Sequence, residues 1–201
     1  MGKKSKVKGS GYELKIAKAL SAWWGHEFHR TPQSGGLRWN DDNNVAGDIV
    51  TPLEANFPFI VECKKREEWT LENLFLNNKD IKYWWEQVVQ DCERVGRTPI
   101  LIFSRNRARD FVMMPYRSSV ESMLHEATDE PVMKTKVSYE DIHKDTHSFD
   151  VLVTTLEGLT ALTPKQVIRS YSDEYFDWRE VETIIPSMEK TPEVEDILNG
   201  I

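Results

Sequence analysis

The sequence predicts an α/β protein in which helices flank a mixed central β-sheet. The first 115 residues predict the order helix, two strands, helix, two strands, and this order is typical of such a layered fold. A chain of 201 residues with 39% hydrophobic content is also long enough to bury one core. We therefore expect a basic N-terminal arm over residues 1–10, a core over 11–117, and an acidic α+β extension or subdomain over 118–201.

The first helix is expected over residues 11–24. Apolar residues recur there at helical spacing, and Gly25 follows as a stop signal. Glu13 stands at the head of the apolar stripe that contains Leu20 and Trp24. A carboxylate at this position either contributes to a site or is a first-turn acid favoured by the helix dipole.

Two short strands are expected next, over residues 47–50 and 58–64, and their closeness suggests a hairpin. Side chains alternate between the two faces of a strand, so Glu62 and Lys64 share one face and lie roughly 7 Å apart. A carboxylate inside an apolar strand is costly to bury unless a cation or hydrogen bonds compensate it. Glu62 therefore indicates either a metal site or a salt bridge at the end of the strand.

The later elements follow from the same signals. A helix over 80–95 is expected to begin at Asp80 as a cap and to stop at Gly96, and Thr163-Pro164 is expected to start another helix. The remaining expectations are a short helix over 70–75, strands over 98–104 and 111–114, a hairpin of 149–155 with 158–162, and helices over 173–185 and 192–198.

The net charge of −7 is unevenly distributed: residues 1–117 carry +4 and residues 118–201 carry −11. A basic first part fits a ligand with a phosphate backbone that is held by local charge. Cys63 and Cys92 have no metal-like spacing, which favours reduced thiols. Neither a secretory leader nor a run of transmembrane length is recognisable, so we expect a soluble cytoplasmic protein without membrane contact.

Five sequence elements stand in order over roughly residues 9–115. They are Glu13 in the first helix, Arg30-Thr31-Pro32-Gln33-Ser34-Gly35, Gly47-Asp48-Ile49, Glu62-Cys63-Lys64, and Gln87 in a later helix. Together they resemble the PD-(D/E)xK nuclease superfamily, and within it the archaeal-type and phage-encoded Holliday junction resolvases. Gly47 replaces the proline that commonly precedes the aspartate, and the polar loop at 40–44 is longer than in the family.

The resemblance implies a restriction-endonuclease-like fold and hydrolysis of DNA assisted by Mg²⁺, for which Mn²⁺ could substitute. Asp48, Glu62 and the backbone carbonyl of Cys63 would bind the metal, and Glu13 would join them directly or through water. Lys64 would orient or deprotonate the attacking water or stabilise the developing charge. These oxygen ligands suit Mg²⁺. Ser34 would contact the scissile phosphate or its neighbour.

The resemblance also implies a DNA partner, here a four-way junction. Arg30, Lys65, Arg66 and Gln87 are the first candidates for contacts to DNA. Two symmetric nicks in a junction imply a two-fold homodimer, and the host cytoplasm would be the location if the source is a bacteriophage. Two alternatives stay open: a restriction-like or repair endonuclease that cuts duplex DNA, and a catalytically silent DNA-binding accessory module.

Overall fold

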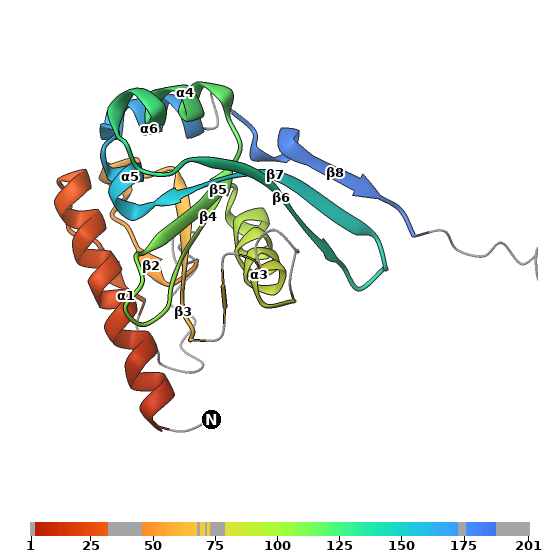
Figure 1. Cartoon of the computed structure of the whole chain (residues 1–201), viewed down its shortest axis with the longest axis horizontal. Helices are drawn as coiled ribbons and strands as arrows, with labels where there is room; N and C mark the ends of the chain where they lie inside the picture. The colour runs from red at the N-terminus through yellow and green to blue at the C-terminus, as the bar shows by residue number, and fades with distance from the viewer. Residues whose placement is uncertain are drawn as a thin grey trace, which may run out of the picture.

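A six-stranded mixed sheet forms the centre of the protein in the computed structural model (Figure 1). The structure describes residues 3–31, 46–67, 69–70, 72, 79–172 and 176–187. The strand order is β3-β4-β5-β7-β6. β5 pairs with residues 151–155 of β7, and β8 pairs with residues 146–149 of the same strand. β3 and β4 are parallel and the other pairs in this sheet are antiparallel, which agrees with the expected mixed sheet flanked by helices.

The first helix, α1 (Lys3–Trp24), begins eight residues earlier than expected. The segment predicted as a basic arm is therefore helical from Lys3, because no proline interrupts the chain before the helix ends. Gly25 ends the helix as predicted: its φ of +76° is a left-handed conformation that glycine adopts readily, and its N–H donates to the carbonyl of Ser21 at 3.0 Å.

The strands β1 (His29–Arg30) and β2 (Ile49–Val50) pair with each other in an antiparallel fashion. The hairpin predicted between 47–50 and 58–64 is wrong. A short 3₁₀ helix, η1 (Leu53–Ala55), and a left-handed residue at Asn56 interrupt the connection, so β2 finds its partner earlier in the chain.

The next elements agree closely with the sequence. They are β3 (Phe59–Lys65), α3 (Lys79–Val95), β4 (Thr98–Ser104) and β5 (Phe111–Pro115). α3 packs on one face of the sheet against β3, β4 and β6, whereas α1 lies against β3 from the other face. Helices expected over 70–75 and 192–198 fall largely or wholly outside the described residues.

The chain after residue 117 extends the same sheet, because β7 pairs with all of β5. Two of its elements, α4 and β6, were not predicted. Figure 1 shows β6, β7 and β8 reaching beyond the body as an arm. The elements of this part are α4 (Ser118–Ala127), β6 (Met133–Glu140), β7 (Thr146–Thr155), α5 (Leu156–Thr160), α6 (Pro164–Tyr171), η2 (Trp178–Val181) and β8 (Glu182–Ile185).

Two further predictions in this part are wrong. The partner of β7 in its hairpin is β6, and the segment predicted as a second strand, 158–162, lies in and after α5. The hydroxyl of Thr155 accepts from the N–H of Gly158 at 3.0 Å and so caps a helix at this point. The helix predicted over 173–185 is replaced in its described residues by η2 and β8, because β8 pairs with residues 146–149 of β7.

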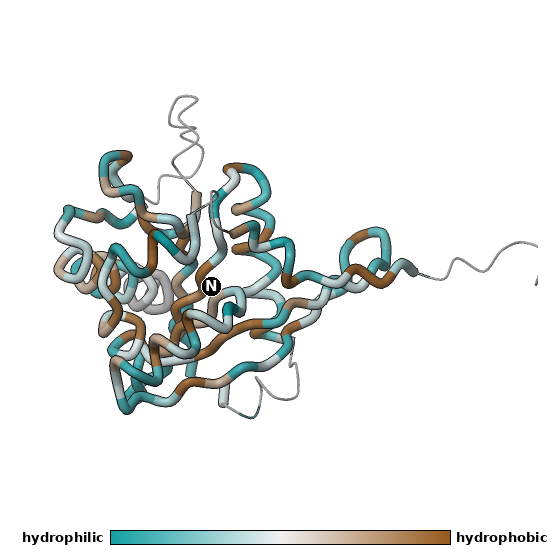
Figure 2. Tube along the Cα trace, turned by 90° about the horizontal axis from the view of Figure 1, so that it is seen from above, coloured by the Kyte–Doolittle hydropathy of each residue, from teal (hydrophilic) through white to brown (hydrophobic). Residues whose placement is uncertain are grey.

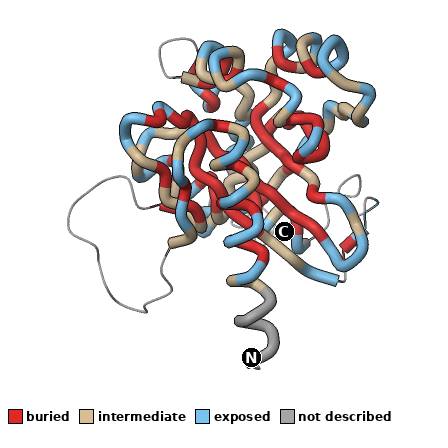
Figure 3. Tube along the Cα trace, turned by 90° about the vertical axis from the view of Figure 1, so that its left-hand side faces the viewer, coloured by how far each residue is buried: buried red, intermediate tan, exposed pale blue. Residues whose placement is uncertain are grey.

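The core is formed by the strands and the inner faces of the helices. Figure 3 shows the strands buried along most of their length, and Figure 2 shows hydrophobic residues along the same segments. An aromatic cluster joins α1, β3 and α6: Trp24 contacts Phe57, and Phe59 contacts Tyr171 with ring centroids 5.0 Å apart. This packing fixes β3 between α1 and α3 and thereby sets the position of Glu62.

Candidate active site

Glu62 and Lys64 project from the same face of β3, toward α3. Glu62 is 2% exposed, and its carboxylate forms an ion pair with the ammonium group of Lys64. Burial, and then the nearby carboxylate of Asp48, raise the pKa of Glu62 to about 7. The predicted salt bridge is thus present, but Lys64 alone does not offset the effect of burial and of the Asp48 carboxylate on Glu62.

Asp48 is held against β3 by backbone geometry. Gly47 has a φ of +73°, and a Cβ at this residue would lie 2.5 Å from the carbonyl oxygen of Val61. This close approach lets the N–H of Asp48 donate to the same carbonyl at 2.8 Å. The carboxylate then accepts a hydrogen bond from the N–H of Cys63, also at 2.8 Å. Burial raises the pKa of Asp48, although this hydrogen bond and Lys64 oppose the shift.

Glu13 reaches the site from α1 and is buried. Its carboxylate lies 3.5 Å from the guanidinium of Arg30 in β1. Burial, and then the charge of Asp48, raise the pKa of Glu13 in spite of this arginine. The structure therefore brings Glu13 within electrostatic reach of Asp48 and places Arg30 as its ion-pair partner.

Gln87 links α3 to the motif on β3. Its side-chain amide donates to Glu62 at 2.9 Å, and its carbonyl oxygen accepts from Lys64 at 2.9 Å. Both ends of the side chain are thus used inside the site. A role in positioning Glu62 and Lys64 follows from this geometry, whereas contact of Gln87 with DNA stays a prediction.

Asp91 is a residue of the site that the sequence reasoning missed. It lies one helical turn after Gln87 on α3, and its negative charge contributes to the raised pKa of both Asp48 and Glu62. Arg94 pairs with Asp91 at 2.9 Å. The spacing of four residues from Gln87 was the available signal, because residues i and i+4 share one face of a helix.

The remaining candidates lie beside the carboxylates or outside the described residues. Lys65 turns to the α1 face, where its ammonium lies 5.7 Å from the ring centroid of Tyr12. Arg66 is exposed at the end of β3. Ser34 belongs to residues 32–45, which lie outside the described part of the chain.

Residues 4–169 match the model of a family described as "Phage putative PDDEXK endonuclease". The match covers most of the chain. This chain belongs to that family. The match agrees with the predicted PD-(D/E)xK superfamily and with a phage origin, and it indicates a nuclease.

Protein D14 of Escherichia phage T5 is a relative of this chain and is 27% identical to it over 110 residues. The aligned part covers 52% of this chain and 67% of Protein D14. No solved structure gives a significant match. In the described part of the chain, no helix combines the length and the apolar character needed to cross a membrane.

Nucleases of the PDDEXK type generally use divalent metals, and the acidic groups fit such an ion in part. Among the described residues, no three side chains of His, Cys, Asp or Glu converge closely enough to hold a metal ion by themselves. Glu62 is nevertheless buried and Asp48 half-buried, and the pKa values of both carboxyl groups are raised. A cation beside them would relieve this excess negative charge, and carboxylates with a backbone carbonyl are the hard oxygen ligands that Mg²⁺ accepts.

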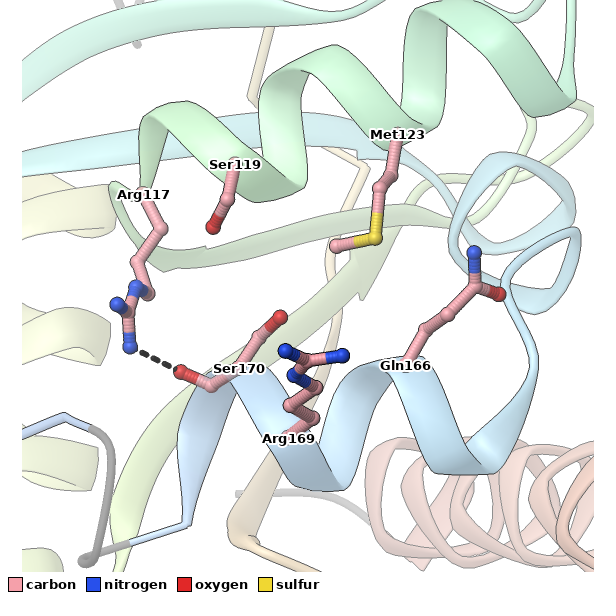
Figure 4. A pocket seen from close by; sticks show the side chains of 6 residues that line it. All are labelled: Arg117, Ser119, Met123, Gln166, Arg169 and Ser170. Carbon is pink, nitrogen blue, oxygen red and sulfur yellow. Dashed lines mark hydrogen bonds between the residues drawn. The ribbon is translucent and has the colours of Figure 1, made fainter.

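A groove lies between α4 and α6 (Figure 4). It has a volume of about 340 Å³. Arg117, at its edge, donates to the carbonyl of Ser170 at 2.5 Å and packs over the ring of Phe176. These contacts give Arg117 a structural role. The lining residues are Arg117, Ser119, Met123, Gln166, Arg169 and Ser170.

Proposed function

We propose that this protein is a Mg²⁺-dependent endonuclease that resolves four-way DNA junctions by paired symmetric nicks. The observation that carries the nuclease part is the meeting of Asp48, Glu62, Lys64 and Gln87 along β3, within a chain of the PDDEXK family. A protein that only binds DNA would have no need for a buried carboxylate, Glu62, whose pKa is raised further by a second carboxylate, Asp48.

In this proposal Asp48, Glu62 and the backbone carbonyl of Cys63 bind Mg²⁺, and Glu13 supports them directly or through water. Mn²⁺ is expected to substitute. When bound, the ion supplies a water of lowered pKa and neutralises negative charge on the reacting phosphate. The N–H of Cys63 fixes the carboxylate of Asp48, so that its second oxygen is available as a ligand.

Lys64 is the cation nearest to the reacting phosphate in this scheme. Gln87 and Glu62 hold its ammonium group from two sides, which restricts its position before substrate binds. A fixed ammonium can orient the attacking water and stabilise the charge that develops on the phosphate oxygens. Gln87 acts here as a positioning residue.

The junction substrate is supported by the resemblance of the motif order to Holliday junction resolvases, including the segment from Arg30 to Gly35. A junction has approximate two-fold symmetry, so one site per subunit requires a homodimer. The reaction would take place in the cytoplasm of the infected host. Arg30, Lys65 and Arg66 are proposed to contact the phosphate backbone, which positions DNA without reading its sequence.

The test is cleavage of an end-labelled four-way junction beside matched linear duplex and single strand, with and without Mg²⁺. Paired nicks near the crossover, lost in Glu62→Gln while junction binding persists, are the expected result. Cutting of duplex alone would keep the nuclease and replace the junction by a restriction-like or repair substrate. Absence of cutting in any metal would favour the accessory module, and full activity of Glu62→Gln would refute the site assignment.

A further inference from the structure

The turn between β4 and β5 brings a second group of cations to the end of β3. β4 runs parallel to β3, and Ser104 pairs with Lys65. The N–H of Arg66 donates to the carbonyl of Ser104 at 3.0 Å. Neighbouring strands lie about 4.8 Å apart, so the turn starting at Arg105 begins one strand spacing from the residues that follow the Glu62-Cys63-Lys64 motif.

This turn has a fixed shape. The buried hydroxyl of Ser104 lies within hydrogen-bond distance of the carbonyl oxygens of Arg105, Ala108 and Arg109, at 3.1, 3.4 and 3.0 Å. The N–H of Ala108 donates to the carbonyl of Arg105 at 3.3 Å, and Arg107 at the tip has a left-handed φ of +60°. The loop is therefore held by its own backbone before any ligand arrives, which lowers the entropic cost of binding.

Ion pairs account for two of its charges. Asp110 at the end of the turn is buried and pairs with Lys15 of α1 at 2.5 Å, and Arg109 pairs with Glu130. Figure 1 shows the turn beside α1 at the same end of the sheet as the end of β3. The pairs tie the turn to α1 and to the segment before β6.

Arg105 and Arg107 have a different environment. Both are exposed, and neither forms an ion pair with a residue in the described part of the chain. Lys65, the last residue of β3, and Arg66 after it lie beside the start of this turn, and Glu67 that follows them is an exposed acid. The end of the sheet that carries the candidate active site thus also carries a surplus of unpaired positive charge, although the whole chain is acidic.

We propose that Arg105 and Arg107 bind the phosphate backbone of DNA next to the scissile phosphate, together with Lys65 and Arg66. This inference rests on the proposed nuclease function and adds the surface that receives the substrate. The partner is a nucleic acid backbone, because an array of separate exposed cations on a rigid turn matches closely spaced phosphates and offers no enclosed pocket for a small ligand.

The groove between α4 and α6 is the weaker candidate for this role. Arg117 is already bound to Ser170 and Phe176, and only Arg169 presents an exposed cation there (Figure 4). The groove also lies away from the β4–β5 turn, because α6 contacts the start of β4 through Tyr171 and Thr98, whereas the turn follows the end of β4 at Ser104.

The test compares a double variant, Arg105→Gln with Arg107→Asn, to a matched control, Lys165→Gln with Arg169→Gln on α6. Both variants remove two exposed cations, and asparagine tolerates the left-handed conformation at position 107. Binding of labelled junction and duplex DNA would be measured by fluorescence anisotropy without divalent cations over a salt series. Thermal unfolding would verify that both variants fold.

Each lost phosphate contact lowers the salt slope by about 0.9, which corresponds to about eightfold in Kd at 0.1 M salt. The turn variant should therefore bind about 60-fold more weakly, with its slope reduced by about 2, and KM should change more than kcat in Mg²⁺. The control should match the wild type. An unchanged Kd in the turn variant, or equal weakening in the control, would overturn this inference. If the wild type still cleaves DNA in that case, the proposed nuclease function stands. A wild type that neither binds nor cuts DNA would overturn both the inference and the proposed function.

Discussion

Replacement of Gly47 by alanine should destabilise the protein and displace Asp48. The added Cβ would lie 2.5 Å from the carbonyl oxygen of Val61 and 2.9 Å from Cγ2 of Ile60, and the residue has a φ of +73°. Backbone and a buried side chain cannot retreat as the end of a flexible side chain could. The segment carrying Asp48 must therefore move away from β3.

The cost follows from two contributions. The left-handed conformation costs about 1–2 kcal/mol for a residue with a Cβ. Separating the segments also weakens the 2.8 Å hydrogen bond from Asp48 to Val61, which is worth about 1 kcal/mol. A loss of about 2–3 kcal/mol lowers Tm by about 4–12 °C in a chain of this length. A shift of Asp48 by about 1 Å would lower cleavage by about 100-fold.

Gly25 and Gly96 provide matched controls, because their φ values are +76° and +73° and a Cβ at either residue meets no atom within 4 Å. Gly25→Ala and Gly96→Ala should therefore show only the conformational cost and keep cleavage activity. Calorimetric Tm and cleavage rates of the three variants would separate the two effects. If Gly47→Ala loses no more stability than Gly96→Ala and cleaves like the wild type, the argument for the close approach is refuted.

Three further outcomes are expected. Burial and Asp48 raise the pKa of Glu62 to about 7 in the folded state. The stability that Glu62 contributes is therefore fully present below about pH 4.3 and is lost as the pH rises to about 7. Glu62→Gln should remove up to about 3 kcal/mol of this pH dependence, measured by unfolding without divalent cations from pH 4 to 8, and an unaltered pH dependence would contradict this expectation. Gln87→Leu removes both hydrogen bonds to Glu62 and Lys64 and should lower kcat by about 10–100-fold with little change in the Kd for DNA; the reverse pattern would make Gln87 a DNA contact. Thr163→Ala removes the capping box of α6 and should cost about 1 kcal/mol, or about 2–4 °C in Tm, with normal cleavage; an unchanged Tm would show that the cap adds nothing.

Local patterns were sufficient for much of the fold. The strands at 98–104 and 111–115 and the helix ending before Gly96 are set by apolar runs and by glycine stop signals, which act over a few neighbouring residues. Predictions failed where pairing partners lie far apart. β2 pairs with β1, which lies well before it in the chain, and β8 pairs with the start of β7. The residue pattern of β2 or β8 alone therefore does not encode its partner strand.

The sequence by itself determined that Glu62 and Lys64 share one face of a strand, because strand periodicity leaves no alternative, and the order of its motifs pointed to the family that the comparison then showed. Only the tertiary structure decided which groups meet there. The contacts that decide this are made between residues at least 15 apart in sequence. They are the hydrogen bond of Asp48 with Cys63, the bridge of Gln87 to β3, the effect of Asp91 on Glu62, and the position of the β4–β5 turn beside β3. The raised pKa of Glu62 follows from burial and from these neighbours, and both arise only when the sheet and its helices pack.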